Sequence, residues 1–249
     1  MKTTSNKTPA GQSSRNRPGR IPPRATRENV RAWSSAPSTR AVVSILAAVI
    51  LALVVWLFWP SPFSNVKNLA SRGSTIVAFG DSLTAGFGAP AGEDYPSSLS
   101  KLIGASVMNG GVSGDTTEMA LARIERDVLS RDPRIVIVGL GGNDFLRGVP
   151  APSTEANLRA IVRKVHQAGA MVVLLGFTFP RLGANYKEIY ARVAREEGCL
   201  LVPEVLDGIL TDPELRSDQI HPNARGYQLI AERVSGPCRK LIRKADAAR

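Results

Sequence analysis

Short apolar runs alternate with helical patterns five times in the second part of this 249-residue chain. A strand followed by a helix, repeated in this way, favours a parallel sheet, because each crossover must return over one face of the sheet. The runs IVIVGL and MVVLLGF suit strands that are buried on both faces. The sequence therefore predicts an α/β domain with helices on both faces of a parallel sheet. Strands are expected at 74–79, 106–109, 135–140, 171–178 and 199–202, and helices at 94–104, 117–130, 153–168, 185–197 and from about 222.

The first 40 residues differ from the rest of the chain in charge. They contain nine Lys or Arg against one acid, Glu28, and so carry +8 of the net charge of +11. Ser, Thr, Pro, Gly and Asn crowd the same stretch, which therefore buries too little apolar surface to fold. We interpret residues 1–40 as a disordered basic tail that acts as a topology signal. Binding of the tail to anionic lipid or nucleic acid is the alternative, and we expect no nucleic-acid partner.

Residues 41–59, AVVSILAAVILALVVWLFW, carry no charge. As a helix they would span roughly 28 Å, close to the roughly 30 Å hydrocarbon core of a bilayer. A buried core helix and a cleaved signal peptide are the alternatives, but the long basic region before the stretch favours an uncleaved transmembrane anchor. The positive-inside rule then predicts a single pass through the inner membrane, with a cytoplasmic N-terminus and a periplasmic or extracellular domain.

After the anchor, residues 60–73 have no periodic apolar face, and they are predicted to be a linker to a domain over 74–249. This domain contains both cysteines of the chain, Cys199 and Cys238. In an exported compartment a disulfide between them is permitted, and two free, buried thiols are the equal alternative. The run RKLIRK at 239–244 is interpreted as the positively charged end of a helix.

Four polar clusters follow four of the predicted strands. Ser82 lies after the first strand in FGDSLTAGFGA, Gly114 after the second in NGGVSGDTT, and Asn143 after the third in GLGGNDF. His221 follows the fifth strand in SDQIHPN. Since ligands of open α/β sheets bind beyond the carboxyl ends of the strands, all four clusters are expected at one edge of the sheet.

A serine hydroxyl is a poor nucleophile unless a base takes its proton, and histidine is the usual base. The chain has two histidines. His166 precedes the amino end of a strand and is expected on a solvated helix face, whereas His221 lies at the predicted edge. Asp218 is three residues before His221, so a turn can bring its carboxylate to Nδ1 and leave Nε2 facing Ser82. The D-x-x-H-P pattern also suits the start of a helix, with Pro222 at the first helical position.

The developing oxyanion of acyl transfer needs preorganised donors. The backbone N–H of Gly114 and the side-chain amide of Asn143 are candidates, although both residue types are also common in ordinary turns. Five apolar residues near these loops either line an acyl pocket or pack in the core. They are Phe87, Phe145, Leu146, Phe177 and Phe179.

GDSL at 80–83, SGDT at 113–116, GGND at 141–144 and D-x-x-H-P at 218–222 resemble, in this order, the four blocks of the GDSL, or SGNH, hydrolases. The likeness is closest to the periplasmic thioesterase I, arylesterase and lysophospholipase branch. It implies a flavodoxin-like, three-layer α/β/α sandwich with a five-stranded parallel sheet. The sequence departs from that branch at Gly139, where an acid is usual, and in part of the loop TFPRLGANY.

The resemblance also implies the roles of the site residues. Ser82 is then the nucleophile and the first oxyanion donor, through its N–H, and Gly114 and Asn143 complete the oxyanion hole. His221 is the base and Asp218 orients it. The family needs neither a metal nor an organic cofactor.

The expected function is that of a membrane-anchored serine esterase. It would hydrolyse a carboxylic ester or thioester of a small-molecule, acyl thioester or lipid substrate through an acyl-enzyme. One alternative is an O-acetylesterase that acts on cell-wall or exported polysaccharide, and a non-enzymatic alternative is a tethered binding module. A metallophosphoesterase is disfavoured because its metal sites need more histidines than this chain has.

Overall fold

The computed structural model describes residues 38–58, 63–177 and 184–249. The chain divides into two compact units, Met1–Trp59 and Pro60–Arg249. In the first unit, Thr39–Phe58 form one helix, α1. None of the helices in the described part of the chain has both the length and the apolarity that crossing a bilayer requires. Most of the predicted basic tail, residues 1–37, lies outside the described residues.

The second unit is built around a sheet of five parallel strands in the order β2-β1-β3-β4-β5. The sheet confirms the predicted α/β class. Because β1 lies between β2 and β3, the chain reverses its direction across the sheet after β2, and the carboxyl ends of β1 and β3 flank this switch point. The strands are β1 (Thr75–Gly80), β2 (Val107–Gly111), β3 (Pro133–Gly139), β4 (Met171–Leu175) and β5 (Leu200–Val202).

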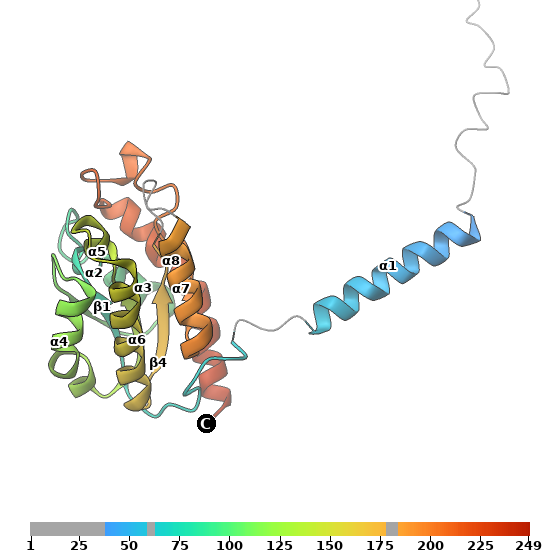
Figure 1. Ribbon diagram of the computed structural model, residues 1–249, viewed down its shortest axis with the longest axis horizontal. Helices are drawn as coiled ribbons and strands as arrows, with labels where there is room; N and C mark the ends of the chain where they lie inside the picture. The colour runs from blue at the N-terminus through green and yellow to red at the C-terminus, as the bar shows by residue number, and fades with distance from the viewer. Residues whose placement is uncertain (1–37, 59–62, 178–183) are drawn as a thin grey trace, which may run out of the picture. The chain divides into compact units, whose positions relative to one another are not determined.

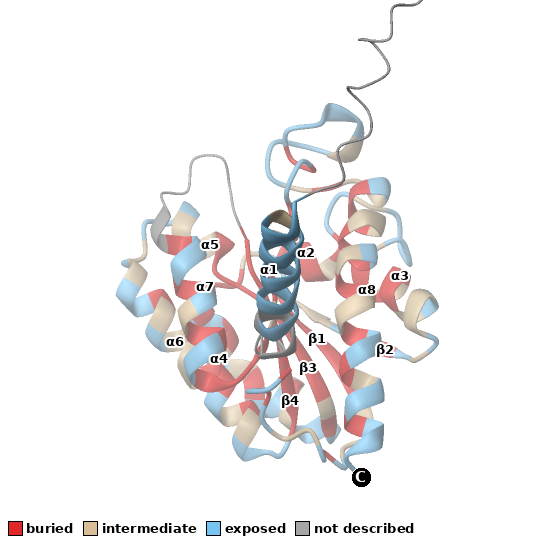
Figure 2. Ribbon diagram, turned by 90° about the vertical axis from the view of Figure 1, so that its right-hand side faces the viewer, coloured by how far each residue is buried: buried red, intermediate tan, exposed pale blue. Residues whose placement is uncertain are grey.

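Helices cover both faces of the sheet and complete the three layers (Figure 1). Helix α3 packs against α8 on one face, and α6 packs against α4 and α7 on the other. The inward faces of the helices and most strand positions are buried (Figure 2): β4 is buried at every position, whereas the edge strand β2 is buried only at Val107. The helices are α3 (Tyr95–Ile103), α4 (Thr117–Asp127), α6 (Ala151–Gln167), α7 (Ala184–Glu197) and α8 (Ala224–Ala247).

Two short helices that the sequence does not predict follow β1 and β3. They are α2 (Ser82–Ala85) and α5 (Gly142–Leu146). Short 3₁₀ helices also form at Leu129–Arg131 and Pro213–Leu215.

The prediction that Pro222 is the first residue of the last helix is wrong. Asn223 caps α8 instead, because its side chain accepts the N–H of Gly226. Pro222 pairs with Arg216 in an isolated antiparallel bridge, so it closes the loop that precedes the helix.

The prediction of a linker at 60–73 is wrong for the part of it that the structure describes. Phe63 and Val66 are buried in the core of the domain. The side chain of Asn68 donates hydrogen bonds to two backbone carbonyls at and just after the end of α6. The packed domain therefore begins by Phe63 rather than at Ser74.

Candidate active site

The turn after β1 places Ser82 at the first position of α2, where it is 9% exposed. Asp81 caps this helix, since its carboxylate accepts the N–H of Leu83 at 3.0 Å. Gly80 has no room for a side chain, because a Cβ at this position would overlap the side chain of Thr84 and the end of β3. The sequence G-D-S therefore folds into a tight strand-to-helix turn that fixes the hydroxyl of Ser82 at the edge of the sheet.

His221 meets Ser82 from the loop before α8. Its Nε2 lies 3.0 Å from Oγ of Ser82, and its Nδ1 lies 2.8 Å from Oδ2 of Asp218. Oδ1 of Asp218 accepts the backbone N–H groups of Ile220 and His221. Partial burial alone would raise the pKa of Asp218, but the hydrogen bonds from His221 and the two N–H groups lower it. The structure thus brings the three predicted side chains together in the order hydroxyl, imidazole, carboxylate.

Asn143 lies where the loops after β1, β2 and β3 meet. Its Nδ2 donates to the backbone oxygen of Asp115 at 2.9 Å and lies 3.4 Å from Oδ2 of Asp81. The amide therefore joins the residue after Gly114 to the residue before Ser82. Gly114 has a φ of 86°, a left-handed conformation that favours glycine. The predicted oxyanion donors are thus gathered at one edge of the sheet.

Sequence reasoning missed the buried charged groups below these loops. Asp81, Asp115 and Asp144 come from three different motifs and are 2%, 4% and 0% exposed. Nε of Arg123, in α4, donates to Asp115 at 2.6 Å, and the guanidinium also donates to the last carbonyl of β1 and to a carbonyl near the end of β2. The signal was present in the sequence, since each motif carries an aspartate directly next to a candidate site residue.

Burial raises the pKa of the Asp81 carboxyl to about 7. The hydrogen bond from the N–H of Leu83 acts in the opposite direction, and the negative charge of Asp115 adds to the increase. A group buried this deeply favours its neutral form unless a cation pairs with it. Asp81 therefore titrates near neutral pH, directly beside the candidate nucleophile.

Exposed apolar side chains border the candidate catalytic residues. The ring of Phe87 lies 4.5 Å from the imidazole of His221, centroid to centroid, and Phe87 is 54% exposed. Tyr227 of α8 holds this loop, since its hydroxyl donates to the backbone oxygen of Phe87 at 2.8 Å. The exposed apolar residues on these loops and helix starts are Phe87, Val112, Met119, Leu146 and Ile220.

The five residues predicted to line a pocket or the core divide between the two environments. Phe87 and Leu146 are exposed at the catalytic edge, whereas Phe177 is buried against Tyr190. Phe145 is partly buried and contacts Tyr186, and Phe179 lies outside the described residues. Phe177 also explains why a side chain at Gly139 would be crowded, because a Cβ there would lie 3.3 Å from its ring.

His166 lies in the last turn of α6, away from the candidate active site. The prediction that it faces solvent is wrong for its ring nitrogens, which are buried and have no hydrogen-bond partner among the described residues. Burial, followed by the positive charge of Lys67, lowers its pKa to about 4.

Cys199 and Cys238 are free and buried, so the structure shows the free-thiol alternative. Burial raises the pKa of both thiols to about 12.

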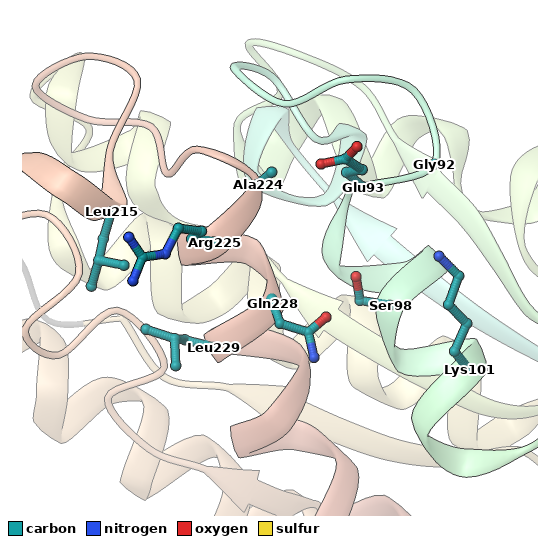
Figure 3. A pocket seen from close by; sticks show the side chains of 9 residues that line it. All are labelled: Gly92, Glu93, Ser98, Lys101, Leu215, Ala224, Arg225, Gln228 and Leu229. Carbon is teal, nitrogen blue, oxygen red and sulfur yellow. The ribbon is translucent and has the colours of Figure 1, made fainter.

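A groove of about 380 Å³ lies between α3 and the start of α8 (Figure 3). Ser98 and Lys101 of α3 lie on one side of it, and Arg225 and Gln228 of α8 on the other. Its remaining lining residues are Gly92, Glu93, Leu215, Ala224 and Leu229. None of the candidate catalytic residues lines this groove, so it is distinct from the site at Ser82.

A parallel α/β sandwich that carries a serine, a histidine and an aspartate in hydrogen-bonded order at its carboxyl edge has the architecture of a serine hydrolase. A profile of the GDSL-like lipase/acylhydrolase family matches residues 78–229. The chain belongs to this family, and it is a serine hydrolase that acts on ester bonds.

Relatives and solved structures agree with this assignment. Thioesterase 1/protease 1/lysophospholipase L1 of Escherichia coli K12 is 33% identical over 195 residues, which cover 74% of this chain and 94% of that protein. The arylesterase of Vibrio mimicus is 32% identical over 180 residues, with coverages of 68% and 90%. The crystal structure of TesA, at 30% identity and a TM-score of 0.64, covers 68% of this chain and 99% of its own.

Proposed function

We propose that the chain is a membrane-anchored serine esterase that hydrolyses carboxylic ester or thioester bonds through an acyl-enzyme. The observation that carries the proposal is the continuous path from Ser82 to Asp218, with 3.0 Å between Oγ and Nε2 and 2.8 Å between Nδ1 and the carboxylate. An imidazole held in this way accepts the serine proton, and the carboxylate stabilises the imidazolium that forms.

In the first step, Oγ of Ser82 attacks the substrate carbonyl carbon while its proton moves to Nε2 of His221. The oxyanion accepts hydrogen bonds from the N–H groups of Ser82 and Gly114 and from the amide of Asn143. The 3.4 Å contact between Nδ2 of Asn143 and Asp81 is long, which leaves one amide hydrogen for the oxyanion.

Collapse of this intermediate breaks the bond to the alcohol or thiol, which leaves with the proton from His221. His221 then takes a proton from water, and the hydroxide attacks the acyl-enzyme. Collapse of the second intermediate returns the proton to Ser82 and releases the carboxylic acid. The cycle closes with no change in the enzyme.

The exposed apolar residues around the triad support substrates with an apolar acyl or aryl group. The ring of Phe87 packs against the imidazole of His221, and Ile220 directly precedes His221 in the chain. An acyl or aryl group that lies on these surfaces is removed from water, which contributes roughly 25 cal/mol of favourable binding free energy per Å² of apolar area buried. The relatives named for thioester, lysophospholipid and aryl ester hydrolysis support the same substrate classes.

The proposal includes an anchor at residues 41–59 in the inner membrane, with the basic tail in the cytoplasm and the catalytic domain in the periplasm or outside the cell. The support is the uncharged apolar stretch and the +8 charge that precedes it. Extraction of membranes at alkaline pH tests the anchor, and protease treatment of spheroplasts tests the orientation. Release of the intact chain by alkali, or a domain that stays protected from protease, would contradict it.

Hydrolysis of p-nitrophenyl esters from acetyl to palmitoyl, and of the matching acyl thioesters, tests the activity. We expect Ser82→Ala to abolish turnover, and Ser98→Ala, a matched change at a buried serine of α3, to retain it. Activity that rises with chain length supports a lipid or thioester hydrolase. Activity confined to acetyl favours the polysaccharide O-acetylesterase, and no serine-dependent activity at all favours a tethered binding module.

A further inference from the structure

The end of the domain opposite the candidate active site carries a group of exposed cations. The strand β4 points away from this end, and the C-terminal end of α8 lies there (Figure 1). The segment that begins at Phe63 packs on the same end, because Nζ of Lys244 lies 5.5 Å above the ring of Phe63 and Arg249 donates to the backbone oxygen of Ser71. We call this surface the basic foot; its exposed cations are Lys67, Arg72, Lys240, Arg243, Lys244 and Arg249.

The cations of the basic foot do not neutralise acidic side chains of the domain. None of the six forms an ion pair with a carboxylate of the described residues. Of the acids near the amino ends of the strands, Glu125 pairs with Lys164 and Asp246 pairs with Arg134. Asp132, directly before β3, accepts the hydroxyl of Ser74 and is the acid here without a cation partner among the described residues. The foot therefore presents a net positive surface to whatever lies against it.

We propose that the basic foot binds the surface of an anionic phospholipid bilayer. Exposed Lys and Arg near such a surface are attracted by the negative potential of its lipids, and several of them act together. A bilayer is favoured over a nucleic acid because only residues 59–62 separate the foot segment from the apolar helix α1. This last reason rests on the proposed anchor, whereas the experiment below does not need it.

Residues 60–249 provide a clean test, because this unit has its own core and the solved structure of TesA consists almost wholly of the matching part. Vesicles of phosphatidylcholine with one third phosphatidylglycerol are sedimented with the domain, beside vesicles of phosphatidylcholine alone. We expect binding to the anionic vesicles only, weakening as the salt concentration rises. Failure to bind anionic vesicles at low salt overturns the proposal.

The variant Arg72→Gln/Lys240→Gln/Arg243→Gln removes three exposed cations of the foot. We expect its partition onto anionic vesicles to fall on the order of a hundredfold. The matched control, Lys187→Gln/Arg216→Gln/Arg225→Gln, removes the same charge from loops and helix starts at the catalytic end, and should bind within a few-fold of the unchanged domain. Equal losses in both variants would show that net charge alone drives binding, which overturns the foot as the site.

Two further readouts separate this proposal from others. Hydrolysis of p-nitrophenyl acetate by the foot variant reports that it is folded, and it tests the proposed esterase function independently of vesicle binding. Binding of a duplex oligonucleotide through the foot, with no binding to vesicles, would overturn the bilayer in favour of a nucleic-acid partner.

Discussion

The candidate nucleophile and its base are held in place by two different kinds of structure. The turn that carries Ser82 begins at Gly80, which has no room for a side chain, and the buried Asp81 between them lies near two further buried aspartates, Asp115 and Asp144, from separate loops. His221 is held by a short loop in which Asp218 is three residues away and has a 44% exposed side chain. The position of the nucleophile is thus set by the whole fold, and that of the base by a local turn. Substitutions on the nucleophile side and on the base side should therefore lower the activity for different reasons.

After the loss of Ser82 itself, the largest effect is expected on the nucleophile side, at Asn143. Asn143→Ala removes the proposed oxyanion donor and the bridge between two loops, so kcat should fall roughly 10²–10³-fold with little change in KM. The control is Asn109→Ala, whose amide donates to the backbone oxygen of Thr84 at 2.8 Å and takes no part in the proposed chemistry. Steady-state kinetics on one soluble ester measure both, and a similar loss in both variants would make Asn143 a structural residue only.

On the base side, Asp218→Ala should cost less than the loss of a buried triad aspartate. Substitution of a buried triad aspartate lowers kcat by about 10⁴-fold, but water reaches the exposed carboxylate of Asp218 and can replace part of its role. We expect a fall in kcat/KM on the order of 10²-fold. The pH–rate profile measures it, and a loss as large as that of Ser82→Ala would show that the local turn is as indispensable as the buried side.

The two sides meet at Gly88. This residue has a φ of 91°, and a Cβ here would overlap Oγ of Ser217 and approach the backbone oxygen of Pro222 to 2.9 Å. Gly92 is a matched control, since its φ is 81° and nothing lies within 4 Å of the added Cβ.

We expect Gly88→Ala and Gly92→Ala each to lower the stability by roughly 1–2 kcal/mol through backbone strain. Gly88→Ala alone should lower kcat/KM, by about tenfold, because it pushes the two loops apart. Urea unfolding and kinetics on the same samples separate the two effects. Equal kinetics for the two variants would mean that the loops do not need this close approach.

The smallest effect on turnover is expected for substitution of Asp81. That substitution should instead change how the free energy of unfolding depends on pH. The unfolded carboxyl ionises near pH 3.8, but the folded carboxyl stays neutral until about pH 7. Stability from this group is therefore full below pH 4 and is lost as the pH rises through 7. Asp81→Asn keeps a capping oxygen and should flatten the fall in unfolding free energy between pH 4 and 8. An unchanged pH dependence would show that Asp81 is ionised in the folded state.

The grouping of the candidate catalytic residues could be predicted because these residues belong to short motifs at strand ends. The carboxyl ends of a parallel sheet, which meet at one edge, placed His221 near Ser82, and the D-x-x-H spacing placed Asp218 beside the imidazole. The role of Phe63 could not be predicted, because a lone aromatic residue among Pro, Ser and Asn has no period and gains its burial from distant contacts. The position of Arg123 could not be predicted either, since three of its four hydrogen-bond partners lie on two strand ends and one loop that only the fold brings together.

Helix α8 begins three residues after His221, is 24 residues long and ends within the basic foot. At 1.5 Å per residue its length is about 36 Å. With the basic foot on a bilayer, the length of α8 sets the distance between the candidate active site and the membrane surface. Ser82 then stands up to about 36 Å above the headgroups. Ester bonds of lipids that stay in the supporting bilayer then lie out of its reach.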